Sequence, residues 1–387
     1  MNILYICTVH GHGKGGHFRS LRAIAEAAGT RHSVLVLSVG VQPSGVLEVG
    51  DFEYVHIKYD FYSVSKMYDQ VKRLAISHSI QCLHFFDATS YRIFSLFPML
   101  NVLKVVLNKC GGPNIKSFPA ASSLVVFSRE NESYYRSHQR FKNSQVFLIS
   151  NRVVRAGVEP SGNDLFPTRG GLKVIRICRI GETYEKSILD SINLIKFLVT
   201  KKQIECSLAI VGVIESEALY QRLVSLPLVR AGYVRIFTSD KYTDNAARFL
   251  PNADAVVGTG RGMMEAMECG LPCFAIDSTG DLPVVIDAST FETAYAFNFS
   301  QRIPFSLAQK KESLSKIDAV AKDSSVRSSL GNFCLQKFES LFEVRAGMTE
   351  YQKVYEFAKP EGDLSAVKLM RFLWGLMSMR RSARNFS

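Results

Sequence analysis

The chain has 387 residues, of which 47% are hydrophobic and 21% are charged, and its formal net charge is +12. This length exceeds what one hydrophobic core normally serves, so we expect about two domains, and the composition excludes an intrinsically disordered chain. The basic excess favours anionic partners such as nucleotides, phospholipid surfaces or nucleic acid, without choosing among them.

The first half of the chain alternates segments typical of strands and of helices. Short apolar runs predict strands at 2–7, 33–39, 81–87, 104–108, 123–128 and 145–150, and amphipathic spacing predicts helices at 18–29 and 63–77. Continuous apolar strands separated by helices are typical of a parallel sheet that is covered on both faces.

The second half repeats this alternation after a segment at 155–171 that is rich in glycine and proline and that we predict to be a linker. Strands are expected at 172–178, 205–212, 233–238, 253–258 and 272–277, and helices at 185–201 and 217–226. We therefore expect two doubly wound, Rossmann-like α/β domains that face a central cleft. Their predicted ranges are 1–160 and 171–355, followed by a basic amphipathic tail at 356–387.

The eight cysteines include no CxxC pair and no spacing typical of disulfides. They predict reduced thiols that pack as small hydrophobic residues in the cytoplasm. The apolar start at 1–7 is too short for a signal peptide, and no apolar run approaches the roughly 20 residues of a membrane span.

The stretch "GTGRGMMEAMECGLP" at 258–272 follows a predicted strand and opens a predicted helix. The amides of the first helical turn would form an anion site, Arg261 would bind phosphate, and Glu265 would accept hydrogen bonds from a ribose diol. The alternative is a glycine-rich turn in which Glu265 only complements the helix dipole. The predicted ligand-binding residues here are Gly260, Arg261, Gly262, Met263 and Glu265.

Arg179 follows a predicted strand, and Lys186 stands seven residues later near the start of a helix. Two cations that face one cleft suit a diphosphate, whereas the alternative is a pair of solvated surface charges.

Together these segments resemble the C-terminal domain of GT-B glycosyltransferases, specifically the large retaining family 4. Arg179 and Lys186 match the Arg and Lys that hold the donor diphosphate in that family, and "EAMECGLP" matches its "EAM-CG-P" motif. Glu265 matches the second Glu of the family's E-x7-E motif, which is associated with ribose. The resemblance implies a nucleotide-diphosphate-sugar donor of the UDP or GDP type, no metal or other cofactor, and retention of configuration.

The sequence departs from the family at two carboxylates. Val257 stands eight residues before Glu265, where the first Glu of E-x7-E is expected, and Val284 replaces the acid of the family's "GG-PE". Asp281 is the candidate for replacing one of these carboxylates in part.

The opening loop "HGHGKGGH" at 10–17 follows the first predicted strand. It resembles the family's glycine-rich loop, so Gly15 and Gly16 would let the backbone lie against the donor diphosphate or the acceptor. A metal site built from His10, His12 and His17 is disfavoured because no Cys or acidic neighbour completes the ligand set. A solvated loop without a role is the remaining alternative.

His84 and Lys109 are the catalytic candidates of the N-terminal domain, beside Arg179 and Lys186 of the C-terminal domain. His84 ends a predicted strand that resembles the family's "H-H" strand, and its alternative is a hydrogen-bonded core histidine. Lys109, on the glycine loop "NKCGGPN", would contact phosphate or acceptor.

Near the end of the chain, the helical spacing of apolar residues predicts a helix that begins near Ser365 and has one apolar face. That face contains Val367, Met370, Leu373, Trp374 and Met377. Two interpretations stay open, a helix that packs on the N-terminal domain and an interfacial helix on an anionic membrane.

These observations predict a glycosyltransferase that moves a sugar from a nucleotide-diphosphate sugar to a glycan or lipid-linked acceptor in surface polysaccharide biosynthesis. We expect it in the cytoplasm or peripherally on the inner face of the cytoplasmic membrane, without a nucleic-acid partner. The alternatives are a nucleotide-sugar 2-epimerase of the same fold and a non-catalytic subunit that binds a partner or a membrane.

Overall fold

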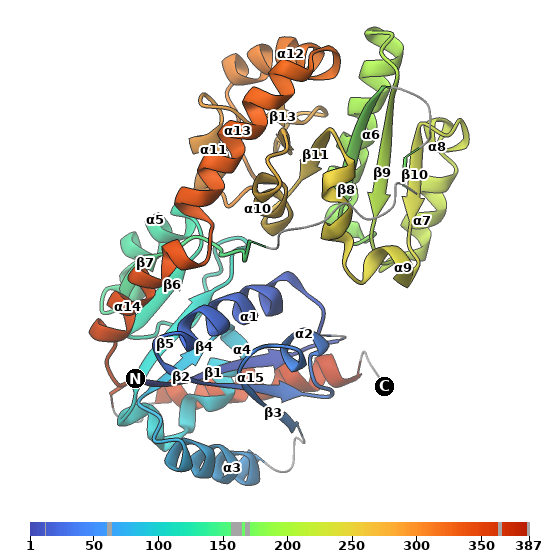
Figure 1. Ribbon diagram of the computed structural model, residues 1–387. Coiled ribbons are helices and arrows are strands. Elements are labelled where there is room, and N and C mark those ends of the chain that lie inside the picture. Colours follow the sequence, from blue (N-terminus) through green and yellow to red (C-terminus); the bar gives the residue numbers. More distant parts are fainter. Residues whose placement is uncertain (12, 60–63, 156–164, 167–170, 363–365, 385–387) are drawn as a thin grey trace. The chain divides into compact units, whose positions relative to one another are not determined.

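The structure, a computed structural model, describes residues 1–11, 13–59, 64–155, 165–166, 171–362 and 366–384. The chain forms two compact units (Figure 1): unit 1 contains Met1–Val154 and Glu343–Ser387, and unit 2 contains Arg155–Phe342. Each unit has its own sheet with helices packed on it, so the predicted pair of Rossmann-like α/β domains is confirmed. Most of the predicted linker at 155–171 lies outside the described residues.

Unit 1 contains a seven-stranded, fully parallel sheet with the order β3-β2-β1-β4-β5-β6-β7. Its strands are β1 (Asn2–Val9), β2 (Ser33–Gly40), β3 (Glu53–Lys58), β4 (Cys82–Phe85), β5 (Lys104–Lys109), β6 (Ser123–Val126) and β7 (Gln145–Leu148). The register places Ile3 of β1 opposite Val34 of β2 and Cys82 of β4. The strand order therefore reverses between β1 and β4, where the loops after both strands meet.

Successive residues of β1 enter two different hydrophobic clusters, as expected for a strand that is buried on both faces. Ile3 and Tyr5 belong to one cluster and Leu4 and Ile6 to the other. The helices of unit 1 are α1 (Gly16–Gly29), α2 (Gly45–Glu48), α3 (Val64–Ser77), α4 (Ala88–Ile93), α5 (Arg129–Ser137), α14 (Met348–Phe357) and α15 (Ala366–Arg384).

The strand β3 was not among the predicted elements. Its sequence "EYVHIK" mixes charged, polar and apolar residues, and only Ile57 is buried. The structure places it at the edge of the sheet, where one side of the strand has no neighbour, so a continuous apolar run is not required.

The last part of the chain returns to unit 1 at Glu343, so the predicted boundary of the second domain at 355 is too late. The physical reason is the apolar face of α14, where Tyr351, Val354 and Tyr355 join the cluster that covers Ile3 and Tyr5. The hydroxyl groups of Tyr5 and Tyr355 are 2.6 Å apart and share a hydrogen bond. A helix 350 residues further along the chain thus completes the core of the first strand.

Unit 2 contains a six-stranded sheet with the order β10-β9-β8-β11-β12-β13, in which only β13 is antiparallel. The strands are β8 (Leu172–Ile177), β9 (Cys206–Val211), β10 (Val234–Phe237), β11 (Ala255–Gly258), β12 (Cys273–Ala275) and β13 (Val284–Val285). The order reverses between β8 and β11, so this unit is also doubly wound.

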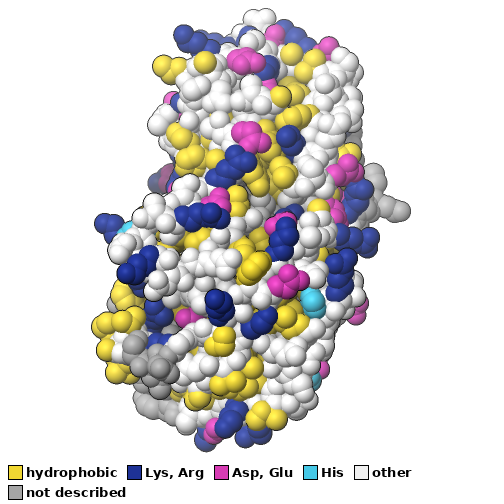
Figure 2. All heavy atoms as spheres, turned by 90° about the vertical axis from the view of Figure 1, so that its left-hand side faces the viewer, with side chains coloured by type: hydrophobic (Ala, Val, Ile, Leu, Met, Phe, Trp, Pro, Cys, Tyr) yellow, Lys and Arg dark blue, Asp and Glu magenta, His cyan; other side chains and the backbone are white. Residues whose placement is uncertain are grey.

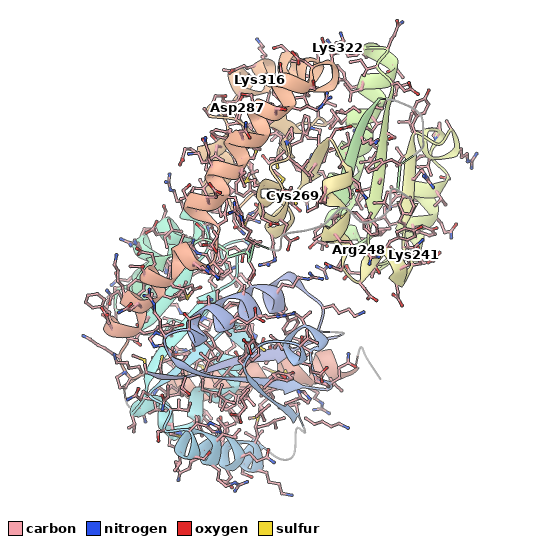
Figure 3. All side chains as sticks on the ribbon, in the orientation of Figure 1. Lys241, Arg248, Cys269, Asp287, Lys316 and Lys322 are labelled. Carbon is pink, nitrogen blue, oxygen red and sulfur yellow. The ribbon has the colours of Figure 1, made fainter. Side chains whose placement is uncertain are left out.

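The helices of unit 2 are α6 (Glu185–Lys196), α7 (Glu217–Val224), α8 (Pro227–Arg230), α9 (Asp240–Thr243), α10 (Arg261–Glu268), α11 (Phe291–Ala296), α12 (Leu307–Lys322) and α13 (Ser324–Leu341). The predicted helix at 185–201 is α6 followed by a π-helical turn at Phe197–Lys201. An ion pair between Lys316 of α12 and Asp287 ties α12 to the segment after β13 (Figure 3).

The "CGLP" part of the sequence motif has a packing role. Gly270 follows α10 with a positive φ of 64°, and α13 crosses so close to it that a Cβ on Gly331 would lie 2.0 Å from the carbonyl oxygen of Gly270. The helix can end and turn back into β12 there because both positions lack a side chain.

The basic residues do not gather in one place on the face of the molecule that Figure 2 presents. Lys and Arg side chains lie between Asp, Glu and hydrophobic side chains over that face. The net charge of the chain therefore marks no single binding surface on this face.

Candidate functional site

The candidate site lies at the carboxyl ends of β8, β11 and β12 in unit 2. The strand order reverses between β8 and β11, which is where open α/β sheets bind their ligands. Of the residues that the sequence singled out, Arg179 lies in the loop after β8, Lys186 at the start of α6 and Arg261 at the start of α10. The loop at 277–283 follows β12.

The loop between β11 and α10 has the predicted form. Gly260 caps α10 with φ 55° and ψ −132°, a conformation that a side chain would strain, and no side chain caps the helix. Arg261 Nε and Glu265 Oε1 form an ion pair at 2.8 Å. The side chain predicted to bind phosphate and the one predicted to bind ribose are thus neighbours on one face of α10, one turn apart.

Two other predicted residues of this loop have different surroundings. The Met263 side chain is fully buried, and its amide donates a hydrogen bond to the Gly260 carbonyl at 3.1 Å, so Met263 stabilises the turn. A Cβ on Gly262 would meet no atom within 4 Å, so the backbone there faces open space that a ligand can approach.

Arg179 and Lys186 are each held by a carboxylate. Arg179 Nη1 lies 2.6 Å from Glu215 Oε1, and its guanidinium also stacks on the Tyr184 ring at 5.1 Å. Lys186 Nζ lies 2.5 Å from Asp190 and donates a second hydrogen bond to the Gly280 carbonyl at 2.7 Å. Lys186 therefore connects the start of α6 to the loop that follows β12.

That loop is organised by Asp277, which is fully buried. Its carboxylate accepts hydrogen bonds from the Gly280 amide and from Lys310 Nζ, both at 2.5 Å. Burial opposes ionisation of Asp277, but the hydrogen bond and charge of Lys310 and the Gly280 amide outweigh it and lower the pKa of the carboxyl group. Burial raises the pKa of Asp190 and outweighs the hydrogen bond and charge of Lys186, which lower it, and the charges of Asp281 and Asp277 raise it further.

Arg176 is the functional candidate that sequence reasoning missed. Its side chain is fully buried, and the guanidinium donates hydrogen bonds to Ser187 Oγ at 2.8 Å, Thr259 Oγ1 at 3.2 Å and the Val257 carbonyl at 3.4 Å. Within the described part of the chain, no carboxylate forms an ion pair with it, and its Nε has no hydrogen-bond partner. The available signal was a charged residue between Ile175 and Ile177 of a strand that was predicted to be buried.

The glycine loop of unit 1 leads into α1 as predicted. Gly15 caps the helix, Gly16 is its first residue, and Ser44 Oγ donates a hydrogen bond to the Gly13 carbonyl at 2.6 Å. His12 lies outside the described residues. Of the residues that the structure describes, no group of three or more His, Cys, Asp or Glu side chains is placed to hold a metal ion.

Asp87 stands at the point where the strand order of unit 1 reverses. Its carboxylate accepts hydrogen bonds from the Thr8 amide at 2.7 Å and the Thr8 hydroxyl at 2.8 Å, and it caps α4 through the Ser90 amide. Thr8 Oγ1 also lies 3.2 Å from His10 Nε2. These contacts join the loops after β1 and β4.

His84 lies in the core of unit 1. It is fully buried, its Nδ1 lies 3.0 Å from the Tyr355 hydroxyl, and its Nε2 lies 3.0 Å from Asn108 Oδ1. Burial lowers the pKa of His84 to about 4, so the ring is neutral at physiological pH. This is the arrangement of a hydrogen-bonded core histidine, and we assign His84 no catalytic role.

Lys109 ends β5 and is almost fully buried. Its ammonium group donates a hydrogen bond to the Gly111 carbonyl and lies 5.8 Å from the centre of the Phe118 ring. These contacts give Lys109 a structural role in holding the glycine loop that follows β5.

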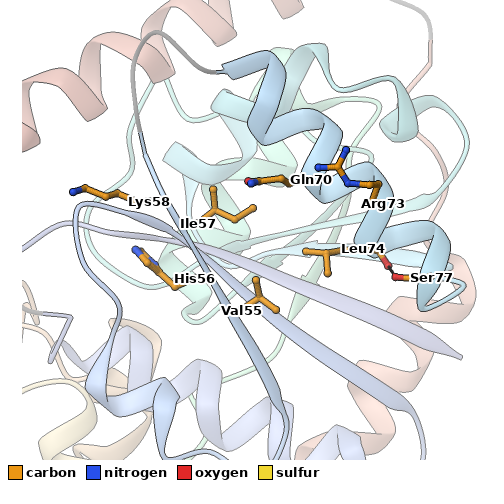
Figure 4. Close-up of a pocket in the computed structure, with 8 residues that line it drawn as sticks. All are labelled: Val55, His56, Ile57, Lys58, Gln70, Arg73, Leu74 and Ser77. Atoms are coloured by element: carbon orange, nitrogen blue, oxygen red, sulfur yellow. Dashed lines mark hydrogen bonds between the residues drawn. The ribbon is translucent and has the colours of Figure 1, made fainter.

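Unit 1 also contains a pocket of about 530 Å³ between β3 and α3 (Figure 4). It is lined by Val55, His56, Ile57, Lys58, Gln70, Arg73, Leu74 and Ser77. Because β3 is the edge strand, this pocket is separated from the reversal between β1 and β4, and it contains none of the predicted site residues.

No protein-family model matches the sequence, and no curated protein matches it. Solved structures do resemble it. A glycosyltransferase from Rickettsia africae superimposes with a TM-score of 0.67 at 12% identity, covering 92% of this chain and 98% of that one. HepE from Anabaena, solved with UDP and glucose, gives a TM-score of 0.62 at 15% identity, covering 91% of this chain and 98% of HepE.

The lipopolysaccharide outer core galactosyltransferase WaaB gives a TM-score of 0.56 at 13% identity, with 92% of this chain and 99% of WaaB covered. At these identities the likeness concerns the fold. The chain has the GT-B fold, with two parallel-sheet Rossmann-like units.

The position of His84 makes the stability of unit 1 sensitive to mild acid. The unfolded histidine takes up a proton near its ordinary pKa of 6.5, whereas the folded one does so only near about 4. The unfolded state therefore binds more protons in this range, and the free energy of unfolding should fall by about 2 kcal/mol from about pH 7 to about pH 5 through this residue.

Trp374, the only tryptophan, lies in unit 1, so denaturant titrations followed by its fluorescence measure this effect. The His84→Gln variant should lose most of the pH dependence, and His10→Gln, a change at an exposed histidine, should retain it. Equal pH dependence in wild type and His84→Gln would contradict the assignment.

Proposed function

We propose that the chain is a glycosyltransferase that uses a nucleotide-diphosphate sugar as donor, and that the donor binds at the carboxyl edge of the unit 2 sheet. The observation that carries this proposal is the buried Arg176, which stands between the first turn of α6, through Ser187, and the amino end of α10, through Thr259. The fold, shared with the solved glycosyltransferases above, supports the proposal.

The electrostatics of this arrangement favour an anion. Burying a guanidinium without a carboxylate costs several kcal/mol, and the amino ends of two helices add positive partial charge beside it. A diphosphate at the strand ends would offset both costs, because its charge is complementary to the guanidinium and to the helix ends. The same positive potential would stabilise the nucleoside diphosphate as it leaves.

The neighbouring residues then have distinct roles. Arg179 and Lys186 would contact the diphosphate, exchanging part of their bonding to Glu215 and Asp190 for bonds to phosphate. Glu265 would accept the ribose hydroxyls, held in position by Arg261 at 2.8 Å. Catalysis by positioning and by stabilisation of the leaving group requires no metal, which agrees with the family 4 resemblance.

The donor class and the acceptor class extend this proposal. HepE has been solved with UDP and with glucose, and this supports a UDP-sugar donor. The outer core galactosyltransferase WaaB supports a glycan or lipid-linked acceptor in surface polysaccharide biosynthesis. Retention of configuration follows from the family 4 resemblance alone.

The function is tested by incubating the full chain with UDP-, GDP-, ADP- and CDP-sugars and measuring the nucleoside diphosphate released, with and without EDTA. We expect slow hydrolysis of one donor, without loss in EDTA. Recovery of an isomerised sugar would identify an epimerase, and nucleotide binding without turnover of any donor would identify a non-catalytic subunit. Either result would overturn the proposal.

Glu265 is tested by nucleotide affinity. In Glu265→Gln a charge-assisted hydrogen bond to ribose becomes neutral, so titration calorimetry should show binding weakened by about tenfold or more. Glu268→Gln, on the last turn of the same helix, is the matched control and should bind normally. An unchanged affinity in folded Glu265→Gln would remove the ribose assignment.

Arg179 is tested by separating kcat from KM. Because charge on the diphosphate grows in the transition state, Arg179→Ala should lower kcat by about a hundredfold, with a smaller effect on KM. Arg222→Ala removes an ion pair of the same length, 2.6 Å to Glu185, from the surface of unit 2 and should have no effect. If Arg179→Ala raises only KM, Arg179 binds the donor without a catalytic role.

A further inference from the structure

The C-terminal helix α15 is docked on unit 1. It packs on α4 and on the 3-10 turn at Phe94–Leu96, and Met379 is buried in the cluster that includes Leu4 and Ile6. A Cβ on Gly375 would lie 2.9 Å from the backbone nitrogen of Ile93, so the two helices are as close as a glycine allows. The interpretation in which this helix packs on the N-terminal domain is thus confirmed.

The face that packs is not the apolar face that the sequence showed. The contact residues include Lys368, whose ammonium group bonds to Asn101 Oδ1 at 2.9 Å, and Gly375 and Met379. The apolar residues point outward, and each of their side chains is between 46% and 64% exposed. They are Val367, Leu369, Met370, Leu373, Trp374 and Met377, which we call the α15 face.

Arginine side chains of α4 and of α15 itself lie where these two helices pack. The Arg92 guanidinium lies 5.3 Å from the Trp374 ring, and the Arg371 guanidinium lies 6.0 Å from the Tyr91 ring. Burial lowers the pKa of Arg92, and the charges of Arg140 and Arg371 lower it further, against the charge of Asp87, which raises it.

The bonds of these arginines go to neutral groups. Arg92 donates to the Ser117 carbonyl at 2.7 Å, and Arg140 donates to the Lys116 carbonyl at 2.5 Å. In the described part of the chain none of the three forms an ion pair with a carboxylate, and Arg371 Nε is buried without a hydrogen-bond partner. The sequence from Ala366 to the end contains no acidic residue.

We propose that the α15 face is a docking surface for an anionic lipid bilayer. An exposed apolar stripe with a tryptophan, bordered by arginines, is the pattern of a helix that lies in the membrane interface. Lipid tails would cover the stripe, and anionic headgroups would neutralise the arginines, each of which contributes to binding near a charged surface.

A second copy of the chain fits this surface less well. A symmetric dimer places the same patch of both subunits in contact, so the arginines of one copy would meet those of the other, and α15 itself has no carboxylate to pair with them. A bilayer supplies the apolar cover and the opposite charge together. Among the described residues, no helix is long and apolar enough to span a membrane, so this contact would be peripheral.

The docking surface bears on the acceptor only if the proposed function holds. In that case binding to the bilayer would place the enzyme beside acceptors that are linked to lipids. The binding test below does not involve donor or turnover, so its result is independent of the glycosyltransferase assay.

The experiment is co-sedimentation of the full chain with vesicles of phosphatidylcholine alone and of phosphatidylcholine mixed with phosphatidylglycerol, at low and high salt. We expect binding to the anionic vesicles only, weakened by salt, with a blue shift of Trp374 fluorescence. Met370→Glu should weaken binding by about tenfold or more, because it places a charge in the apolar stripe. Arg140→Gln should weaken it by about fivefold.

Phe357→Glu is the matched control. Phe357 is the last residue of α14, whose buried residues belong to the cluster around Tyr5 and not to the cluster that contains Met379. It is 56% exposed, as is Met377 of the α15 face. The proposal is overturned if wild type stays in the supernatant with anionic vesicles at low salt, if it binds neutral vesicles equally, or if Phe357→Glu weakens binding as much as Met370→Glu. A dimer in sedimentation velocity that Met370→Glu dissociates would assign the face to a second copy instead.

Discussion

A buried guanidinium controls the candidate site of this protein. Arg176 joins β8 to the first turn of α6, to the end of β11 and to the loop before α10, and each of its bonds goes to an uncharged oxygen. Burial of this charge without a carboxylate partner lowers the stability of the folded state, and it occurs at the edge of the sheet where the strand order reverses. Such a cost is consistent with a site that binds an anion, and the rest of the site is arranged around it.

The loops around Arg176 are tied together by carboxylates. Glu215 holds Arg179, Asp190 holds Lys186, and Asp277 holds the loop whose Gly280 carbonyl accepts a bond from Lys186. Three strand ends thus form one connected network, in which the cations already have a fixed direction. If a diphosphate binds here as proposed, Arg179 and Lys186 are already oriented, and this lowers the entropic cost of binding.

Unit 1 uses the end of the chain for two purposes. The apolar face of α14 closes the core around Tyr5, and the docked helix α15 covers the other face of the sheet while exposing its own apolar residues. Because α15 is held through Lys368, Gly375 and Met379, its exposed stripe belongs to the packed surface of unit 1. The proposed membrane contact therefore requires no unfolding or release of the helix.

Local sequence determined the elements that depend on neighbours in the chain. The apolar runs marked all strands except β3 and the two-residue β13, and the pattern of Gly260, Arg261 and Glu265 marked the start of α10, because strands buried on both faces and helix caps have short-range patterns. Tertiary structure alone decided that Arg176 is buried, that His84 is held by Tyr355, and that α15 turns its apolar face outward. Those outcomes depend on contacts between residues far apart in the chain, such as His84 and Tyr355 at a separation of 271 positions, and no local periodicity encodes which partner will cover a given side chain.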